Sequence, residues 1–177
     1  MGYREGKDIN YWCDYIKEID KDSKIITFGE SMGAATVLYG NEYGYNDNVK
    51  GIIEDCGYAY IPQVYEFTAH QMGINKVFTK IGVSAMNVAF FIFFRMRVYK
   101  HSPLTGIKRK SIPICFIHGD IDQIVPYESF LMFKENINKD TKAVFETFKG
   151  SKHCSAFKNE TDRYMKIITS FIKENAN

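Results

Sequence analysis

This 177-residue sequence carries almost no net charge, although a quarter of its residues are charged. Lys and Arg number 23 against 21 Asp and Glu, which leaves a net charge of +2. Nucleic-acid-binding proteins and proteins that bind anionic membranes usually carry a basic excess. The overall balance therefore gives no electrostatic reason to expect either partner, and it favours a neutral or small substrate.

Paired cysteine motifs are also missing. The cysteines Cys13, Cys56, Cys115 and Cys154 are scattered, without a C-x-x-C pair or a metal-ligand spacing. Three of them lie in apolar stretches, where a thiol packs as a small hydrophobe. We expect reduced, structural cysteines and no metal. The chain as given does not begin with a basic segment followed by an apolar stretch, so we expect no secretory leader and a cytoplasmic protein.

The most apolar stretch, residues 88–94, is short. It stops at Arg95 and Arg97, well before the roughly 20 apolar residues that a spanning helix needs. We expect a buried or cap helix here, with an interfacial membrane helix as the less favoured alternative. No membrane span is predicted.

Apolar periodicity predicts alternating helices and strands. Helices are expected over about 3–20, 34–39, 127–136 and 160–174, and strands over 24–28, 49–54, 111–117 and 142–148. Short apolar strands separated by helices favour a mostly parallel sheet covered on both faces, so the predicted fold class is α/β. The length suits a single domain over 1–177. Residues 58–110 do not continue this alternation of strands and helices, and we expect a helical, cap-like insertion there.

A serine lies at the junction of the first predicted strand and the following helix. The junction reads Gly29-Glu30-Ser31-Met32-Gly33. A G-x-S-x-G sequence between a strand and a helix is typical of a nucleophile elbow, in which a sharp turn exposes the serine hydroxyl. Because a free hydroxyl is protonated near neutral pH, Ser31 needs a base to act as a nucleophile.

His153 is the preferred base among four histidines. It follows the last predicted strand in a Gly-containing loop, at the sheet edge where open α/β sheets place their ligand sites. His70 and His101 lie in or beside the insertion. His118 ends a strand just before a glycine, where we expect it to shape the turn.

Asp122 is the preferred partner for that histidine. It follows the third predicted strand, so the chain order is Ser, Asp, His. Its role would be to orient the His153 ring and to stabilise the imidazolium. Asp120 is the obvious rival, and Asp55, at the end of the second strand, is a weaker one, because acids at strand ends often serve as caps.

Several of these segments resemble the α/β-hydrolase fold superfamily. Residues 118–126 resemble its H-G-x-x-D-x-x-V-P segment, whose fifth residue is the catalytic acid. Residues 29–33 resemble its nucleophile elbow, and residues 150–153 its terminal histidine loop. Residues 31–37 and 52–58 are similar to a bacterial esterase-like branch of serine hydrolases. The fold implied by this resemblance is an α/β-hydrolase sheet.

The resemblance implies a carboxylic ester hydrolase without a metal or organic cofactor. Ser31 would attack the acyl carbonyl of a small ester-like substrate, His153 would pass the proton to the leaving alcohol, and Asp122 would orient His153. The backbone N–H of Met32 would stabilise the oxyanion. A peptidase or a thioesterase with the same triad remains open, as does a catalytically silent fragment that acts as an interaction module.

The family's sheet has about eight strands, and the four predicted here correspond to strands five to eight. The first four strands, and the loop that supplies the second oxyanion donor, are not found in this chain. We expect either a fragment of a longer hydrolase or self-association through the exposed edge of the strand at 24–28, and in both cases an oligomer.

The predicted insertion is rich in aromatic residues. They could line an acyl pocket, but we expect most of them to pack against the sheet. These residues are Tyr60, Tyr65, Phe67, Phe78, Phe90, Phe91, Phe93 and Phe94.

Overall fold

The computed structural model describes residues 2–108 and 112–176, and its centre is a four-stranded parallel sheet in the order β1-β2-β3-β4. The strands are β1 (Ile25–Glu30), β2 (Val49–Asp55), β3 (Ile114–Gly119) and β4 (Ala143–Phe148). The helices are α1 (Glu5–Ile19), α2 (Met32–Tyr43), α3 (Ile61–Gln71), α4 (Lys76–Phe94), α5 (Leu104–Lys108), α6 (Glu128–Asn136), α7 (Ala156–Asn159) and α8 (Thr161–Ala176). The predicted α/β class is confirmed.

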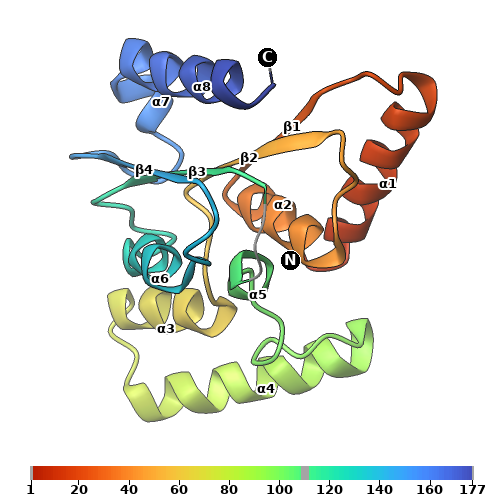
Figure 1. The fold of residues 1–177 in the computed structure, drawn as a ribbon. Coiled ribbons are helices and arrows are strands. Elements are labelled where there is room, and N and C mark those ends of the chain that lie inside the picture. Colours follow the sequence, from red (N-terminus) through yellow and green to blue (C-terminus); the bar gives the residue numbers. More distant parts are fainter. Residues whose placement is uncertain (1, 109–111, 177) are drawn as a thin grey trace.

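Helices cover both faces of the sheet. In Figure 1, α7 and α8 lie on one face, and α2, α5 and α6 lie on the other. Side chains alternate along the central strand β3: Ile114 and Phe116 pack towards α2 and α6, whereas Cys115 and Ile117 pack towards Phe171 of α8. Alternation is a consequence of the two-residue repeat of a strand. Because both faces are buried, β3 is apolar over four consecutive residues.

Parallel pairing brings the carboxyl ends of all four strands to one edge. Each parallel connection needs a crossover, which the helices provide. Three strands extend further towards this edge than the sequence pattern predicted, and β2 does so by one residue, Asp55. β1 includes Gly29 and Glu30, since Glu30 is in register with Asp55. β3 includes His118, which is in register with Thr147.

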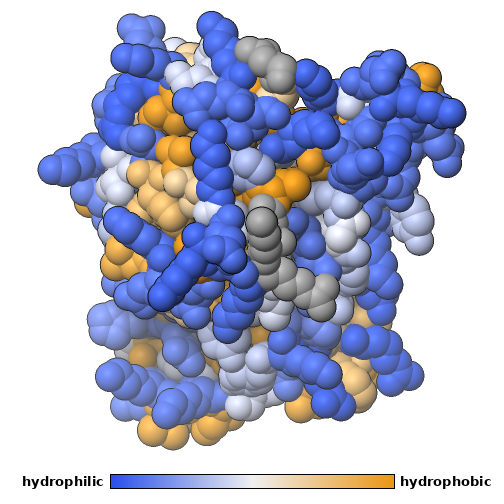
Figure 2. Space-filling model, in the orientation of Figure 1, coloured by the Kyte–Doolittle hydropathy of each residue, from blue (hydrophilic) through white to orange (hydrophobic). Residues whose placement is uncertain are grey.

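The segment between β2 and β3 is helical, as predicted, but α4 is not a buried helix. Of its 19 residues, Val83 is the buried one, while Phe78 is 70% and Phe93 77% exposed. The expectation that most aromatic residues of this segment pack against the sheet is therefore wrong. The physical reason is that α4 packs on α3, at the rim of the molecule, and not on a strand. Figure 2 shows hydrophobic side chains along the lower rim, which α4 forms in this orientation.

The length of α4 also changes the sequence interpretation. The apolar run at 88–94 is the end of a longer helix, because residues 76–87 continue the same apolar character. By length and composition alone, α4 is long enough to cross a membrane, with 11% of its most apolar window buried. The sequence interpretation held that the apolar stretch is too short to span a membrane. The structure corrects this, because the whole helix has 19 residues.

The edge strand β1 leads to a prediction about association. Among the described strands it pairs with β2 alone, and its Phe28 is 53% exposed. Because an open strand edge is a template for another chain, we expect a dimer or larger oligomer at micromolar concentration, measured by size-exclusion chromatography with light scattering. Phe28→Lys should shift the protein towards monomer, whereas Leu131→Lys, at an exposed apolar position on α6, should not. A monomeric wild-type protein would contradict the prediction.

Candidate active site

Ser31 forms the whole turn between β1 and α2. β1 ends at Glu30 and α2 begins at Met32, which leaves Ser31 with φ 56° and ψ −116°. This backbone region is sparsely populated by residues other than glycine, and such strain is concentrated at functional sites. The backbone N–H of Ser31 donates to the carbonyl oxygen of Asp55 at 2.8 Å, so the turn is tied to the end of β2.

The glycine two residues before Ser31 is required by close packing. A Cβ at Gly29 would collide with the backbone of Gly33, whereas a Cβ at Gly33 would enter open space. The first glycine therefore allows the strand and the helix to approach each other, and the second is not needed sterically. This tight junction is what projects the Ser31 side chain from the sheet edge.

Three side chains from separate parts of the chain meet at this edge. His153 Nε2 lies 2.8 Å from Ser31 Oγ, and His153 Nδ1 lies 2.6 Å from Asp122 Oδ2. The His153 side chain is 12% exposed and Ser31 is half-buried, so the serine is reachable from solvent. The structure thus brings together the three residues that the sequence selected, in the geometry of a nucleophile, a base and an orienting acid.

Asp122 is held as a carboxylate. Its Oδ1 accepts hydrogen bonds from the backbone N–H groups of Ile124 at 2.8 Å and Val125 at 2.9 Å. Burial alone would raise the pKa of Asp122. Hydrogen bonds from His118, His153 and the Ile124 N–H outweigh burial and hold the pKa well below its usual range. The acid is therefore ionised near neutral pH.

His118 is the last residue but one of β3 and is fully buried, with its ring against the loop that follows the strand. Its Nε2 lies 3.2 Å from the carbonyl oxygen of Val125 and 3.4 Å from Asp122 Oδ2. Since a carbonyl only accepts, Nε2 carries the proton, and His118 supports the loop that holds Asp122. The four-residue spacing in H-G-x-x-D was the available sequence signal.

The rival acids are engaged elsewhere. Asp120 accepts the backbone N–H of Gly150 at 2.6 Å, which ties the turn after β3 to the histidine loop. Asp55 accepts the Tyr164 hydroxyl at 2.7 Å, and burial raises the pKa of Asp55 to about 6. Neither carboxyl group is among the hydrogen-bond partners that the described residues give His153.

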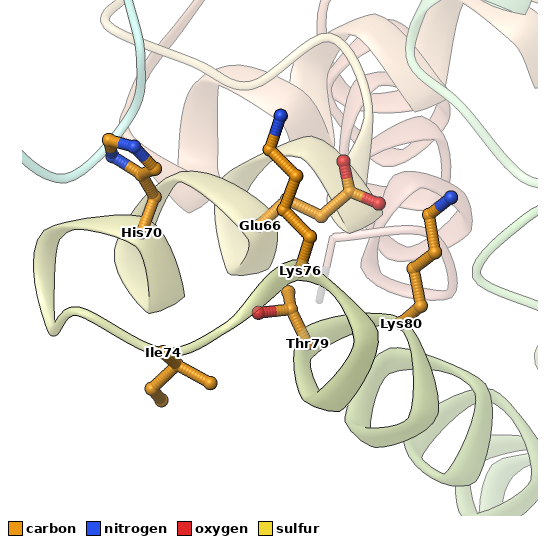
Figure 3. Close-up of a pocket in the computed structure, with 6 residues that line it drawn as sticks. All are labelled: Glu66, His70, Ile74, Lys76, Thr79 and Lys80. Atoms are coloured by element: carbon orange, nitrogen blue, oxygen red, sulfur yellow. The ribbon is translucent and has the colours of Figure 1, made fainter.

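The other two histidines lie away from Ser31. His101 stacks on Tyr3, with ring centroids 3.8 Å apart. His70 lines a cavity of about 360 Å³ between α3 and α4, shown in Figure 3, which also contains Glu66 and Lys76. That cavity contains no member of the Ser31, His153 and Asp122 cluster.

One backbone donor can be assigned for an oxyanion among the described residues. Met32 is the first residue of α2, and the first N–H groups of a helix have no partner within the helix. The positive end of the helix dipole adds to this donor. Its position directly after Ser31 suits the role that the sequence assigned to Met32, which stays a prediction.

The described residues place one group of metal-type donors beside the serine. Cys56, Cys154 and His153 have donor atoms within 4.8 Å of one another, and the two sulfur atoms lie 3.5 Å apart. Both ring nitrogens of His153 already make the hydrogen bonds described above. Burial raises the pKa of Cys154 to about 11 and that of Cys56 further, so both thiols are protonated near neutral pH. Metals bind thiolates, and we assign no metal to this group.

Comparison with known proteins gives one family and many structures. The sequence matches the prolyl oligopeptidase family over residues 1–177. No curated protein matches the chain. Similar solved structures include the butyrate-bound esterase Est2 of Thermogutta terrifontis, with TM-score 0.68, 16% identity and coverage of 98% of this chain and 64% of that chain.

Two further structures come from Pyrococcus species. An esterase of Pyrococcus furiosus has TM-score 0.66, 18% identity and coverage of 96% of this chain and 62% of that chain. An acylaminoacyl peptidase of Pyrococcus horikoshii has TM-score 0.67, 17% identity and coverage of 96% of this chain and 27% of that chain. Each of these three proteins is longer than this chain. At such identities the likeness shows the fold, and the α/β-hydrolase resemblance indicated by the motifs is confirmed.

Proposed function

Because this chain belongs to the prolyl oligopeptidase family, we propose that it hydrolyses carboxylic esters with Ser31 as nucleophile. The observation that carries the proposal is the continuous hydrogen-bonded path from Ser31 Oγ through His153 to Asp122, with distances of 2.8 and 2.6 Å. This path provides a nucleophile next to a base whose ring orientation is held by an ionised acid.

The proposed reaction has two steps. Ser31 Oγ attacks the acyl carbonyl while His153 Nε2 takes the hydroxyl proton, and the Met32 N–H stabilises the oxyanion. His153 then returns the proton to the alcohol oxygen, the C–O bond breaks, and the acyl group stays on Ser31. A water molecule, deprotonated by His153, attacks the acyl carbon, the bond from that carbon to Ser31 Oγ breaks, and His153 returns the proton to Ser31 Oγ as the acid leaves. Asp122 stays ionised throughout and stabilises the imidazolium.

An ester is favoured over an amide because the site has a single assigned oxyanion donor. Loss of one such donor costs roughly 10²- to 10³-fold in rate. An alkoxide is a far better leaving group than the amide anion that C–N cleavage without prior protonation would expel, and an ester carbonyl has less resonance stabilisation than an amide. An ester therefore tolerates this loss better. The butyrate complex of the similar esterase supports a short acyl group. The peptidase alternative draws support from the matched family and from the similar acylaminoacyl peptidase.

We include a cellular compartment and binding partners in the same proposal. The cysteines in the described residues are free, which suits a reducing cytoplasm. A small ester is the proposed substrate, and no nucleic-acid partner or cofactor is proposed. Self-association at β1, or pairing of β1 with a segment outside this chain, would complete the sheet edge.

A matched pair of substrates tests the choice of leaving group. We expect hydrolysis of 4-nitrophenyl butyrate and at least ~10²-fold slower hydrolysis of butyryl 4-nitroanilide, which has the same acyl group. The thioester with 4-nitrothiophenol extends the series. Faster cleavage of the anilide would support the peptidase, and faster cleavage of the thioester the thioesterase. Folded protein that cleaves none of the three would support the silent interaction module.

A further inference from the structure

The balanced net charge conceals a long segment without acidic residues. Between Glu66 and Asp120 lie eight of the 23 basic residues and none of the 21 acidic ones, so this segment carries +8 and the rest of the chain −6. Lys76 and Lys80 lie in the first turns of α4, and Arg97 lies just beyond its end. The expectation that charge gives no case for an anionic surface holds for the whole chain but not for this segment.

One face of α4 anchors the helix to the rest of the molecule. Val83 is buried, and Met86 and Phe90 pack against the cluster that contains Ala35 and Tyr58. These three α4 residues follow the three- and four-residue spacing of a single helical face.

The opposite face of α4 is apolar and open to solvent. Val77, Ile81, Val88 and Ile92 recur at spacings of four, seven and four residues, which places them on one face, and their exposed fractions are 63, 59, 55 and 59%. A solvent-facing helix normally carries polar residues on the side away from the core. Neither usual explanation of an apolar helix applies, because α4 is neither mostly buried nor near the N-terminus.

Both ends of α4 are held on the same side of the molecule. Before it, α3 packs against α4, and the two are joined by residues 72–75. After it, Met96 and Val98 are buried in the cluster that receives Phe90. A spanning helix would place its two ends on opposite sides of a bilayer. The geometry therefore fits a helix that lies along a surface.

Basic side chains lie near both ends of α4. Figure 3 shows Lys76 and Lys80 extending on the α3 side of α4, whereas Ile74 points away from them. At the other end, the Arg97 guanidinium lies 4.9 Å from the Phe91 ring centroid. Cations at both ends of an apolar stripe, with aromatic rings beside them, are the composition of an interfacial helix.

We propose that α4 docks the protein onto an anionic phospholipid surface, with Val77, Ile81, Val88 and Ile92 at the acyl boundary and the flanking Lys and Arg residues on lipid phosphates. The charge pattern favours lipid over a second copy, since a symmetric contact between two α4 helices would bring two acid-free basic segments together. The cytoplasmic leaflet carries the anionic lipids that this surface requires. The inference is independent of the activity of Ser31.

Vesicle flotation of the full chain tests the proposal. We expect wild-type protein to float with phosphatidylcholine vesicles that contain about 30% phosphatidylglycerol and not with pure phosphatidylcholine, and the binding to fall as salt rises. Ile81→Ser/Ile92→Ser should lower the partition coefficient at least ~10-fold, because it removes two apolar anchors. Lys76→Gln/Lys80→Gln should lower it about 10-fold or more, and only on anionic vesicles.

Matched variants keep the test decisive. Ile19→Ser/Leu131→Ser removes two exposed apolar side chains from α1 and α6 and should bind vesicles like wild type. Ser31→Ala should also bind normally, which separates this inference from the proposed function. Circular dichroism checks that each variant is folded.

The proposal is overturned by folded wild-type protein that does not float with anionic vesicles, by equal binding to neutral vesicles, or by an α1 and α6 control that loses binding equally. A variant Ile81→Ser/Ile92→Ser that turns an oligomer into a monomer while vesicle binding is unchanged would assign the face to a second copy.

Discussion

Replacing Ser31 by alanine is expected to abolish covalent labelling by a fluorophosphonate probe and to lower ester hydrolysis by about 10⁴-fold or more. The reason is that Ser31 Oγ is the proposed attacking atom, placed 2.8 Å from His153 Nε2. Labelling is measured by intact mass, which counts the sites, and hydrolysis by release of 4-nitrophenol. Ser84→Ala, at an exposed serine on α4, is the control and should keep full labelling.

The same position offers a second readout that does not depend on activity. Because Ser31 has φ 56° and ψ −116°, Ser31→Gly should relieve backbone strain. We expect this variant to be as inactive as Ser31→Ala but more stable than it by about 1 kcal/mol in denaturant unfolding. Labelling that persists in both variants would place the nucleophile elsewhere. Folded wild-type protein that takes no label would point to the silent module.

Replacing Asp122 by asparagine is expected to lower kcat by about 10⁴-fold without unfolding the protein. The N–H groups of Ile124 and Val125 both point at Oδ1, so they hold the amide oxygen of the introduced side chain there. The amide NH₂ then faces His153 Nδ1, where only an acceptor orients the ring correctly. His153 would be forced to carry its proton on Nε2, and it could not take the proton of Ser31.

Asp120→Asn is the matched control for this prediction. Asp120 accepts the backbone N–H of Gly150, and an asparagine oxygen can accept the same hydrogen bond. We therefore expect a change in kcat of less than about 10-fold, against the loss of about 10⁴-fold at Asp122. Steady-state kinetics on 4-nitrophenyl butyrate measures both. A larger loss in Asp120→Asn than in Asp122→Asn would reverse the assignment of the acid.

Patterns within short stretches of sequence predicted the presence and type of the helices and strands well. The β-branched run before Ser31 predicted β1, and the three- and four-residue spacing before Asp20 predicted α1. The strand ends were predicted less accurately. Glu30 and His118 read as turn residues beside glycines, but each lies in strand register with a neighbouring strand that is distant in sequence.

Sequence motifs predicted the three residues of the candidate site, but they did not predict the contacts that surround those residues. The residues Ser31, Asp122 and His153 were selected by motif and chain order, although 122 residues separate the first from the last. The support that His118 gives to Asp122 was missed, because burial inside β3 depends on the pairing of β3 with two other strands. The roles of Asp120 and Asp55 likewise depend on partners contributed by other loops and helices.

Helix α4 shows most clearly that a sequence pattern does not predict which residues are buried. An apolar periodic segment reads as buried, since burial is the usual fate of such residues. Whether another element covers it depends on the packing of α3 and of Met96 and Val98, and this packing leaves one face open.

The sequence by itself determined the α/β class, the nucleophile elbow and the order of the proposed triad, because periodicity and motif spacing are properties of short stretches of chain. Tertiary structure alone decided what the rival acids Asp120 and Asp55 contact, that His118 is buried beside Asp122 and which face of α4 is exposed. These outcomes depend on which distant elements come into contact, and contact sets burial, hydrogen-bond partners and pKa.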